Sequence, residues 1–194
     1  GSLISNATLF TFWNTALDCT NDSATADLWK GIVFNNNGNA IGVLNIDSST
    51  ISYSDSGLVV NAPFFTYKNG SYLNNRSPIL INNVVINSNN ALVKNNLFKN
   101  DDNFYPYIYN KTLVQLNGIA NLEVSDNDFI QDTYIISTNP VHSAILLEND
   151  YAGIGNFGNI KIDHNSFTNF HYGINTNEGN FKTKIEYNNF NSTT

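Results

Sequence analysis

The segment "NLEVSDNDF" at residues 121–129 has the same pattern as "NIKIDHNSF" at residues 159–167. In the first copy, Leu122 and Val124 alternate with polar residues, Asn127 follows, and Phe129 comes two positions after it. Alternate residues of a β-strand point to the same side. The spacing therefore predicts two short strands that meet at a bend next to the asparagine.

The pattern recurs in phase along the chain, although about a fifth of the residues are asparagine and a single match could arise by chance. Further copies are Leu44, Ile46, Ser49, Ile51; Ala91, Val93, Asn96, Phe98; and Thr183, Ile185, Asn188, Phe190. A weaker copy at Ile79, Ile81, Val84 and Ile86 keeps the apolar residues and lacks the asparagine.

A second type of strand alternates with these windows, in which a small or polar residue precedes a β-branched run. Its copies are "KGIVF" 30–34, "SGLVV" 56–60, "TLVQL" 112–116, "SAILL" 143–147 and "YGINT" 172–176. Helix-favouring residues are sparse, and methionine is absent. Repeated short strands with a return path predict a solenoid, in which each coil buries its inward residues against the next.

In such a solenoid the recurring asparagine has two expected roles. It tolerates left-handed backbone at a tight bend, and stacked copies can hydrogen-bond to one another along the column. The Phe or Ile beyond it is expected in the core. We predict an all-β, right-handed parallel β-helix of about six or seven coils. Long loops are expected at two corners, one including 99–111 and 130–142 and the other 61–78 and 148–158.

We expect one domain at residues 3–194, a fragment of a longer protein with neighbouring domains, and an expression scar at residues 1–2. The x-h-x-h-x-x-N-x-F rhythm followed by a "GI" strand resembles right-handed parallel β-helix proteins of the pectate-lyase-like superfamily. Residues 27–60 resemble the repeat regions of large secreted or surface-attached bacterial proteins. The resemblance implies the architecture, and an extracellular or cell-surface location.

A leucine-rich repeat is the competing interpretation, because residues 119–129 also fit its L-x-x-L-x-L-x-x-N-x-L template. Leucine is not dominant, the phenylalanine spacing is irregular, and the return paths contain a second strand where that fold requires a helix or turn. These features favour the β-helix.

Composition limits the partners. The chain of 194 residues has a net charge of −7 and only nine Lys and Arg, with Arg76 the sole arginine. It has no basic stripe to neutralise a phosphate backbone, so nucleic acid is not expected as a partner. No apolar run predicts membrane insertion. The single cysteine, Cys19, rules out an internal disulfide. We expect no cofactor and no metal.

The corner after the phenylalanine windows is the candidate binding site. Tyrosines at alternate positions flank Pro106, and carboxylates lie at the base of the segment. Aromatic faces beside carboxylates and amides suit sugar rings, so a glycan or another cell-surface ligand is expected here. The alternative is that these tyrosines only pack the loop onto the rod. The predicted ligand-binding residues are Asp101, Asp102, Tyr105, Tyr107, Tyr109, Tyr134, His142, His171 and Tyr172.

Other clusters are interpreted as structural. The bend column is expected to bring Asp126 beside His164, as a solvated face, with an acid/base pair or weak divalent site as the alternative. Glu123 and Lys161 are expected side by side as an exposed ion pair. The aromatic residues of 62–77 are expected to pack a loop.

The leading hypothesis is a non-catalytic extracellular β-helix module, a rigid adhesin-like scaffold that binds glycan through its loops. A polysaccharide lyase or glycoside hydrolase is the alternative. Of the elements that the resemblance would require of a polygalacturonase, only the pair Asp101–Asp102 is present, and for a lyase we expect no lysine beside an acidic cluster. A viral receptor-binding fibre, which would have to trimerise, is the third hypothesis.

Overall fold

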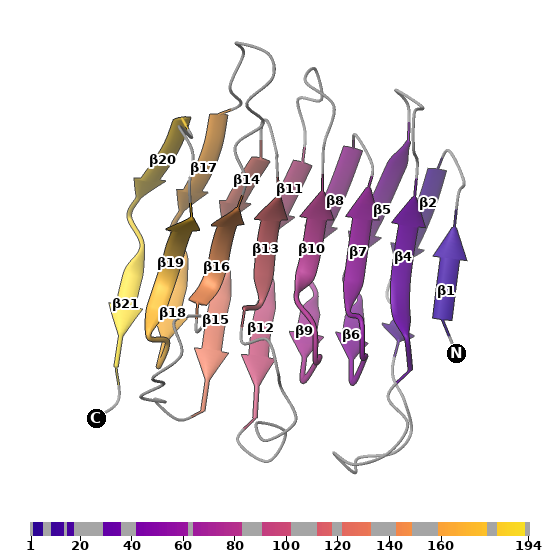
Figure 1. The fold of residues 1–194 in the computed structure, drawn as a ribbon, viewed down its shortest axis with the longest axis horizontal. Helices are drawn as coiled ribbons and strands as arrows, with labels where there is room; N and C mark the ends of the chain where they lie inside the picture. Colours follow the sequence, from indigo (N-terminus) through magenta and orange to yellow (C-terminus); the bar gives the residue numbers. More distant parts are fainter. Residues whose placement is uncertain are drawn as a thin grey trace.

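The structure is a computed structural model, and every regular element in the part of the chain that it describes is a β-strand. Figure 1 shows the strands side by side along the longest axis, in sequence order. The described residues are 2–5, 9–13, 15–17, 29–35, 42–61, 64–82, 91–101, 112–117, 122–132, 143–148, 159–177 and 182–192.

These strands form three parallel sheets of seven strands each, here called sheets A, B and C. Sheet A contains β1 (Ser2–Ser5), β4 (Gly31–Asn35), β7 (Leu58–Asn61), β10 (Ile79–Asn82), β13 (Val114–Asn117), β16 (Ser143–Glu148) and β19 (Tyr172–Asn177). Sheet B contains β2 (Leu9–Trp13), β5 (Val43–Asp47), β8 (Phe64–Lys68), β11 (Ala91–Lys94), β14 (Leu122–Ser125), β17 (Asn159–Asp163) and β20 (Lys182–Glu186). Sheet C contains β3 (Ala16–Leu17), β6 (Thr50–Ser52), β9 (Ser71–Leu73), β12 (Leu97–Asn100), β15 (Asp128–Gln131), β18 (Ser166–Thr168) and β21 (Asn189–Asn191).

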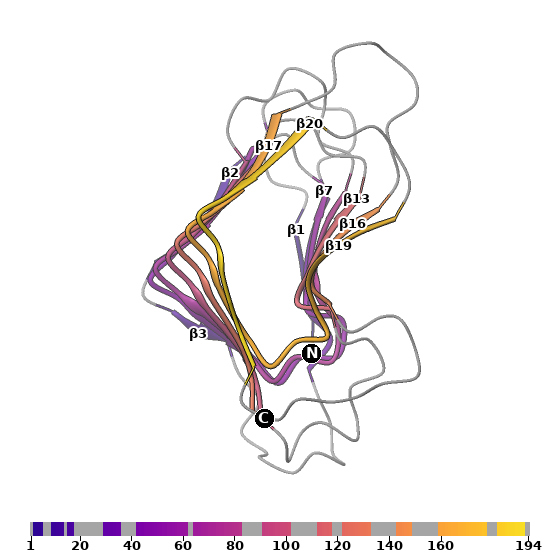
Figure 2. The same ribbon diagram turned by 90° about the vertical axis from the view of Figure 1, so that its left-hand side faces the viewer.

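Three consecutive strands, one from each sheet, make one coil, and the described strands form seven coils of a right-handed parallel β-helix. Figure 2 looks along the stack: sheets B and C meet at a sharp bend, and sheet A faces them across the interior. The predicted fold class is therefore confirmed. The alternation of two strand types is confirmed as well, because all five "GI"-type segments lie in sheet A.

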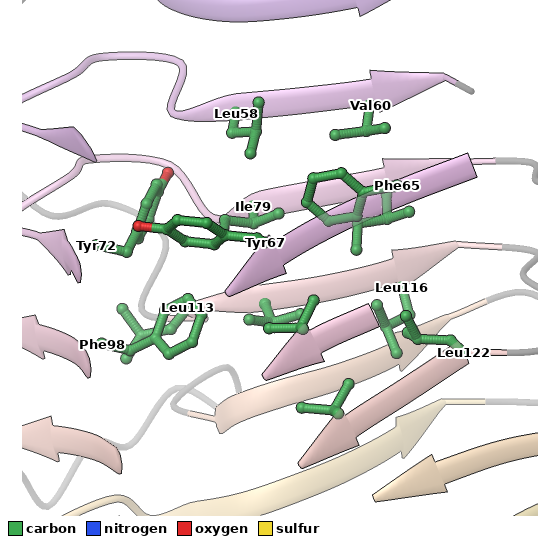
Figure 3. Close-up of a cluster of buried hydrophobic side chains, with 14 of the residues drawn as sticks. Leu58, Val60, Phe65, Tyr67, Tyr72, Ile79, Phe98, Leu113, Leu116 and Leu122 are labelled. Carbon is green, nitrogen blue, oxygen red and sulfur yellow. The ribbon is translucent and has the colours of Figure 1, made fainter. Parts of the chain in front are cut away.

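The interior is a set of columns in which equivalent residues of successive coils lie over one another (Figure 3). Phe98, Phe129 and Phe167 are at most 2% exposed. Their rings stack with centroids 4.7 Å and 5.1 Å apart and planes inclined by 10°. The predicted role of the phenylalanine as core is thus confirmed.

The asparagines after the sheet B strands form a buried ladder. Asn127 Oδ1 accepts the backbone N–H of Asn96 at 3.0 Å, and Asn165 Oδ1 accepts that of Asn127 at 3.0 Å. Asn188 Oδ1 continues the series by accepting the N–H of Asn165 at 2.9 Å. The Asn127 side chain also donates to the Val93 carbonyl oxygen at 2.9 Å. Each amide therefore joins its own coil to the coils before and after it.

The left-handed backbone, however, is not at the ladder asparagine, and this part of the prediction is wrong by one residue. The residue just before the ladder position has a φ between 49° and 56° in every described coil from the second to the seventh. These residues are Ser48, Asn69, Asn95, Asp126, His164 and Tyr187. The positive φ turns the backbone at this residue. The side-chain amide of the next residue can then point into the rod.

Two boundaries predicted near the middle of the chain are also wrong. Residues 64–68 and 71–73 are β8 and β9, not a loop, and Phe65, Tyr67 and Tyr72 are fully buried. Their register pairs Phe65 with Ala91, so this segment supplies the sheet B and sheet C strands of the third coil. Residues 79–82 belong to sheet A as β10, not to a weaker copy of the sheet B window.

The sequence pattern did not identify the third coil, because other residues occupy its asparagine and phenylalanine positions. Gly70 occupies the ladder position, where its N–H donates to Asn96 Oδ1 at 2.9 Å, and Tyr72 replaces the phenylalanine. Burial raises the pKa of Tyr67 and Tyr72 far above the usual value, so both phenols stay neutral. The hydroxyl of Tyr72 donates to the Ser77 carbonyl oxygen at 2.7 Å, which satisfies its polar end.

A second ladder of asparagine side chains follows the end of the sheet A strands. Asn61 donates to Asn35, Asn82 donates to Asn61 at 3.0 Å, and Asn117 donates to Asn82 at 3.3 Å. These side chains are half-buried. The high asparagine content therefore serves two separate columns.

Apart from 61–78, which contains β8 and β9, the predicted long connections join the strands at two corners. One, the C–A corner, joins sheet C to sheet A and contains the segments that follow β12 and β15. The other, the A–B corner, contains the segment between β16 and β17. The B–C bend is two residues long wherever it is described from the second coil onward, because the ladder fixes it.

Substituting the central ladder residue should destabilise the whole rod. In the Asn127→Ala variant the buried N–H of Asn96 and the carbonyl of Val93 lose their partner, so we expect unfolding to become easier by about 2–4 kcal/mol. Urea unfolding followed by far-UV circular dichroism measures this change. Asn189→Ala, at an exposed position of β21, is the matched control and should change stability by less than about 0.5 kcal/mol.

Candidate functional site

Three of the nine predicted ligand-binding residues lie in the described part of the chain, all at the C–A corner. Asp101 follows β12 directly, His171 precedes sheet A in the last turn, and Tyr172 is the first residue of β19. The other six lie outside the described residues: Asp102, Tyr105, Tyr107, Tyr109, Tyr134 and His142.

Asp101 belongs to a cluster that links three successive coils. Lys99 Nζ lies 2.7 Å from Asp101 Oδ1 and 3.2 Å from Asp132 Oδ1. The Asn74 side chain donates to Asp101 Oδ2 at 2.8 Å and accepts the Asp101 backbone N–H at 2.8 Å. The expectation that no lysine lies beside an acidic cluster is therefore wrong. Lys99 is brought to the neighbouring coil's Asp132 by the register of β12 and β15.

The charged groups of this cluster shift one another's pKa toward the ionised form. The hydrogen bonds to Asp101 and Asp132 raise the pKa of Lys99. Burial alone would raise the pKa of Asp101, but the Asn74 amide and the Lys99 ammonium hold it below its usual value. Asp101 is consequently an ionised acceptor at neutral pH, suited to binding a hydroxyl or a cation and unsuited to donating a proton.

His171 and Tyr172 form an exposed aromatic pair one coil further on. Their rings meet edge to face with centroids 4.4 Å apart, and Tyr172 is 42% exposed. Just before this pair, the Asn169 side chain donates to the backbone carbonyl oxygens of Gln131 at 2.9 Å and Asp132 at 3.1 Å, which ties this turn to the previous coil. The corner therefore presents carboxylates and an aromatic surface on neighbouring coils.

A second ion cluster lies at the same corner in the earlier coils. Asp55 accepts Lys30 Nζ at 3.1 Å and Arg76 Nη1 at 2.8 Å. Arg76 is in the turn between β9 and β10, so the only arginine closes a turn and is not part of a long loop. Burial would raise the pKa of Asp55, but the two cations lower it.

The outward face of sheet B carries the predicted column of polar bend residues. Asp126 and His164 occupy successive positions, as expected. The His164 ring stacks on Tyr187 at 5.0 Å, and its Nδ1 lies 2.9 Å from Asp163 Oδ2. Asp126 pairs instead with Lys94 at 3.3 Å. The column is a solvated face with its charges satisfied locally.

Asp163 is the most buried carboxylate on this face. Its side chain is 6% exposed and accepts Lys161 Nζ at 2.8 Å. Burial would raise the pKa of Asp163, but hydrogen bonds from Lys161 and His164 lower it. Glu123 and Lys161 do lie opposite each other, as predicted, yet the direct ion pair of Lys161 is with Asp163.

Two further features concern ions and membranes. Within the described ranges, no three His, Cys, Asp or Glu side chains are grouped so that they could hold a metal ion. The same residues contain no helix long and apolar enough to cross a membrane.

Comparison with protein-family models, with curated proteins and with solved structures gives no match for this chain. The functional argument therefore depends on the residues of the site itself.

Acid should weaken the rod partly through Asp163. Because its pKa is lowered in the folded state, its contribution is present above about pH 4, the unfolded value, and is lost as the pH falls through the folded value. We expect Asp163→Asn to lower stability at pH 7 by about 1–2 kcal/mol and to lose less stability than the unmodified chain between pH 5 and pH 2.

Urea titrations at pH 7, 5, 3 and 2 measure this dependence. Asp128→Asn is the control, since Asp128 is exposed and forms no ion pair with any cation in the described part of the chain. An Asp163→Asn variant with the same acid dependence as the unmodified chain would contradict the interpretation.

Proposed function

We propose that this chain is a non-catalytic, rigid β-helix module of an extracellular or cell-surface protein, and that it binds glycan at the C–A corner. The observation that carries the proposal is that the exposed pair of His171 and Tyr172 lies at the same corner as the ionised cluster of Lys99, Asp101 and Asp132, on the coil after that of Asp132. Aromatic faces take the C–H side of a sugar ring, and carboxylates accept its hydroxyls.

Rigidity follows from the interior. The ladder from Asn96 to Asn188 and the stack from Phe98 to Phe190 run through the same four coils, so neighbouring coils cannot shift past one another without losing both. A scaffold of this kind holds a corner surface in fixed geometry. Binding then requires little loss of conformational entropy in the protein.

The charge supports an extracellular role. The net charge of −7 and the pI of 4.6 suit a soluble surface that repels nucleic acids and anionic lipids. In the described corner, the ammonium of Lys99 is already engaged by two carboxylates. A neutral or hydroxyl-rich glycan suits this corner better than an acidic one.

A carbohydrate-active enzyme is the second candidate, and the position of Lys99 between two carboxylates is the observation that favours it. Glycoside hydrolysis needs one carboxylic acid with a raised pKa, whereas the pKa of Asp101 is lowered. A lyase base needs a group that gives up its proton readily, and the pKa of Lys99 is raised. The lowered pKa of Asp101 and the raised pKa of Lys99 both favour binding over catalysis.

Glycan binding should depend on Tyr172. On an array of neutral and acidic glycans, we expect the chain to bind neutral oligosaccharides, and we expect Tyr172→Ala to weaken that binding about tenfold through lost stacking. Trp13→Ala is the matched control, because Trp13 is an exposed aromatic residue on sheet B, 68% exposed. Equal losses in the two variants would show that the contact is not at this corner.

The same preparations separate binding from catalysis. Incubation with neutral and acidic polysaccharides, followed by product analysis, should give no new reducing or unsaturated ends. Products that disappear in a Lys99→Gln variant would overturn the non-catalytic proposal and establish the enzyme.

A further inference from the structure

The C–A corner of the second and third coils carries a cluster in which two cations share one carboxylate. Lys30 Nζ lies 3.1 Å from Asp55 Oδ2, and Arg76 Nη1 lies 2.8 Å from Asp55 Oδ1. Every other carboxylate with an ion pair in the described ranges has a single lysine as its cation, and only Asp163 adds a histidine. Among the described residues, two permanent cations therefore meet one carboxylate only at Asp55.

Backbone hydrogen bonds between stacked turns hold this cluster in place. The Asp55 N–H donates to the Trp29 carbonyl oxygen at 2.8 Å, and the Arg76 N–H donates to the Ser54 carbonyl oxygen at 2.8 Å. Lys30 follows Trp29 directly. The three charged side chains therefore start from fixed points on successive C–A connections, and a ligand that binds them requires no rearrangement of this backbone.

The cluster carries excess positive charge and is open to solvent. Burial would raise the pKa of Asp55, but Lys30 and Arg76 lower it, so this carboxylate is ionised at neutral pH and one anion stands against two cations. The side chains of Lys30, Arg76 and Asp55 are 69%, 32% and 26% exposed. An ammonium has three N–H donors, and Asp55 accepts one of them from Lys30. Lys30 can therefore donate to a second acceptor.

We propose that this cluster is an anion site that binds a small carboxylate between Lys30 and Arg76. Asp55 shows the fit, because its one carboxylate group reaches nitrogens of both cations. A second carboxylate of the same shape can bridge the same pair, and it brings the cluster to two anions and two cations. Such charge-assisted hydrogen bonds are stronger than neutral ones, and the planar guanidinium matches a carboxylate. The site lies on earlier coils than the proposed glycan site and does not depend on it.

Titration with acetate, followed by NMR of the backbone amides, tests the site. We expect the amide signals of residues 54–56 and 76 to shift with a dissociation constant of about 1–10 mM, since the net charge of −7 opposes any anion. Sodium chloride at the same ionic strength should not shift them, because a spherical ion lacks the two oxygens that bridge the cations. Lys30→Gln should abolish the acetate shifts. Equal shifts with chloride, or acetate shifts that persist in Lys30→Gln, would refute the site.

Removal of the resident carboxylate gives a result that a purely structural ion pair does not predict. In Asp55→Asn both cations lose their shared partner, so acetate should bind about tenfold more tightly. Asp47→Asn is the matched control, because it changes the net charge equally and removes the partner of a single lysine, Lys68; it should leave binding at Lys30 unchanged. Circular dichroism checks that both variants keep the fold. Unchanged acetate affinity in Asp55→Asn, or an equal gain in Asp47→Asn, would contradict the anion site.

Discussion

The structure depends on satisfying the asparagine amides placed inside the B–C bends of the fourth to seventh coils. An asparagine placed inside the rod must find partners for both its oxygen and its nitrogen, because an unpaired polar group there is costly. Asn127 meets this demand only if Asn96 lies directly above it and Asn165 directly below. A shift of one residue in the fifth or sixth coil would break the hydrogen bonds to both neighbouring asparagines, so the register of these coils follows from the amides.

The fixed register decides what the outside can do. Outward residues of successive coils also fall into columns, which is why Lys99 reaches Asp132 and why His164 stacks on Tyr187. Most of these contacts neutralise charge on a solvated face. The C–A corner differs because two of its connections are long and its aromatic pair remains exposed, so under the proposed function changes in the loops alter the binding surface while the interior stays constant.

The sequence predicted the coil well where its pattern was complete. Period-two apolar residues, Asn127 and Phe129 identified the fold, the sheet A strands and the two loop corners. The prediction failed where a different residue occupies a position of the pattern. Gly70 stands at the asparagine position and supplies only a backbone N–H to the ladder. Tyr72 fills the phenylalanine position, and its hydroxyl donates to a carbonyl oxygen. The prediction also misplaced the left-handed residue, since Asn95 precedes Asn96 and either could adopt that backbone. The Lys99 cluster needed the register between coils, which no local pattern contains.

Native-state hydrogen exchange, followed by NMR, tests the ladder most directly. The backbone N–H groups of Asn96, Asn127 and Asn165 donate to buried side-chain oxygens of the following coil, so they should exchange slowly and together, with the free energy of global unfolding. Exchange of these three amides at the rates of an unstructured peptide would contradict the ladder, and with it the register of the fourth to seventh coils.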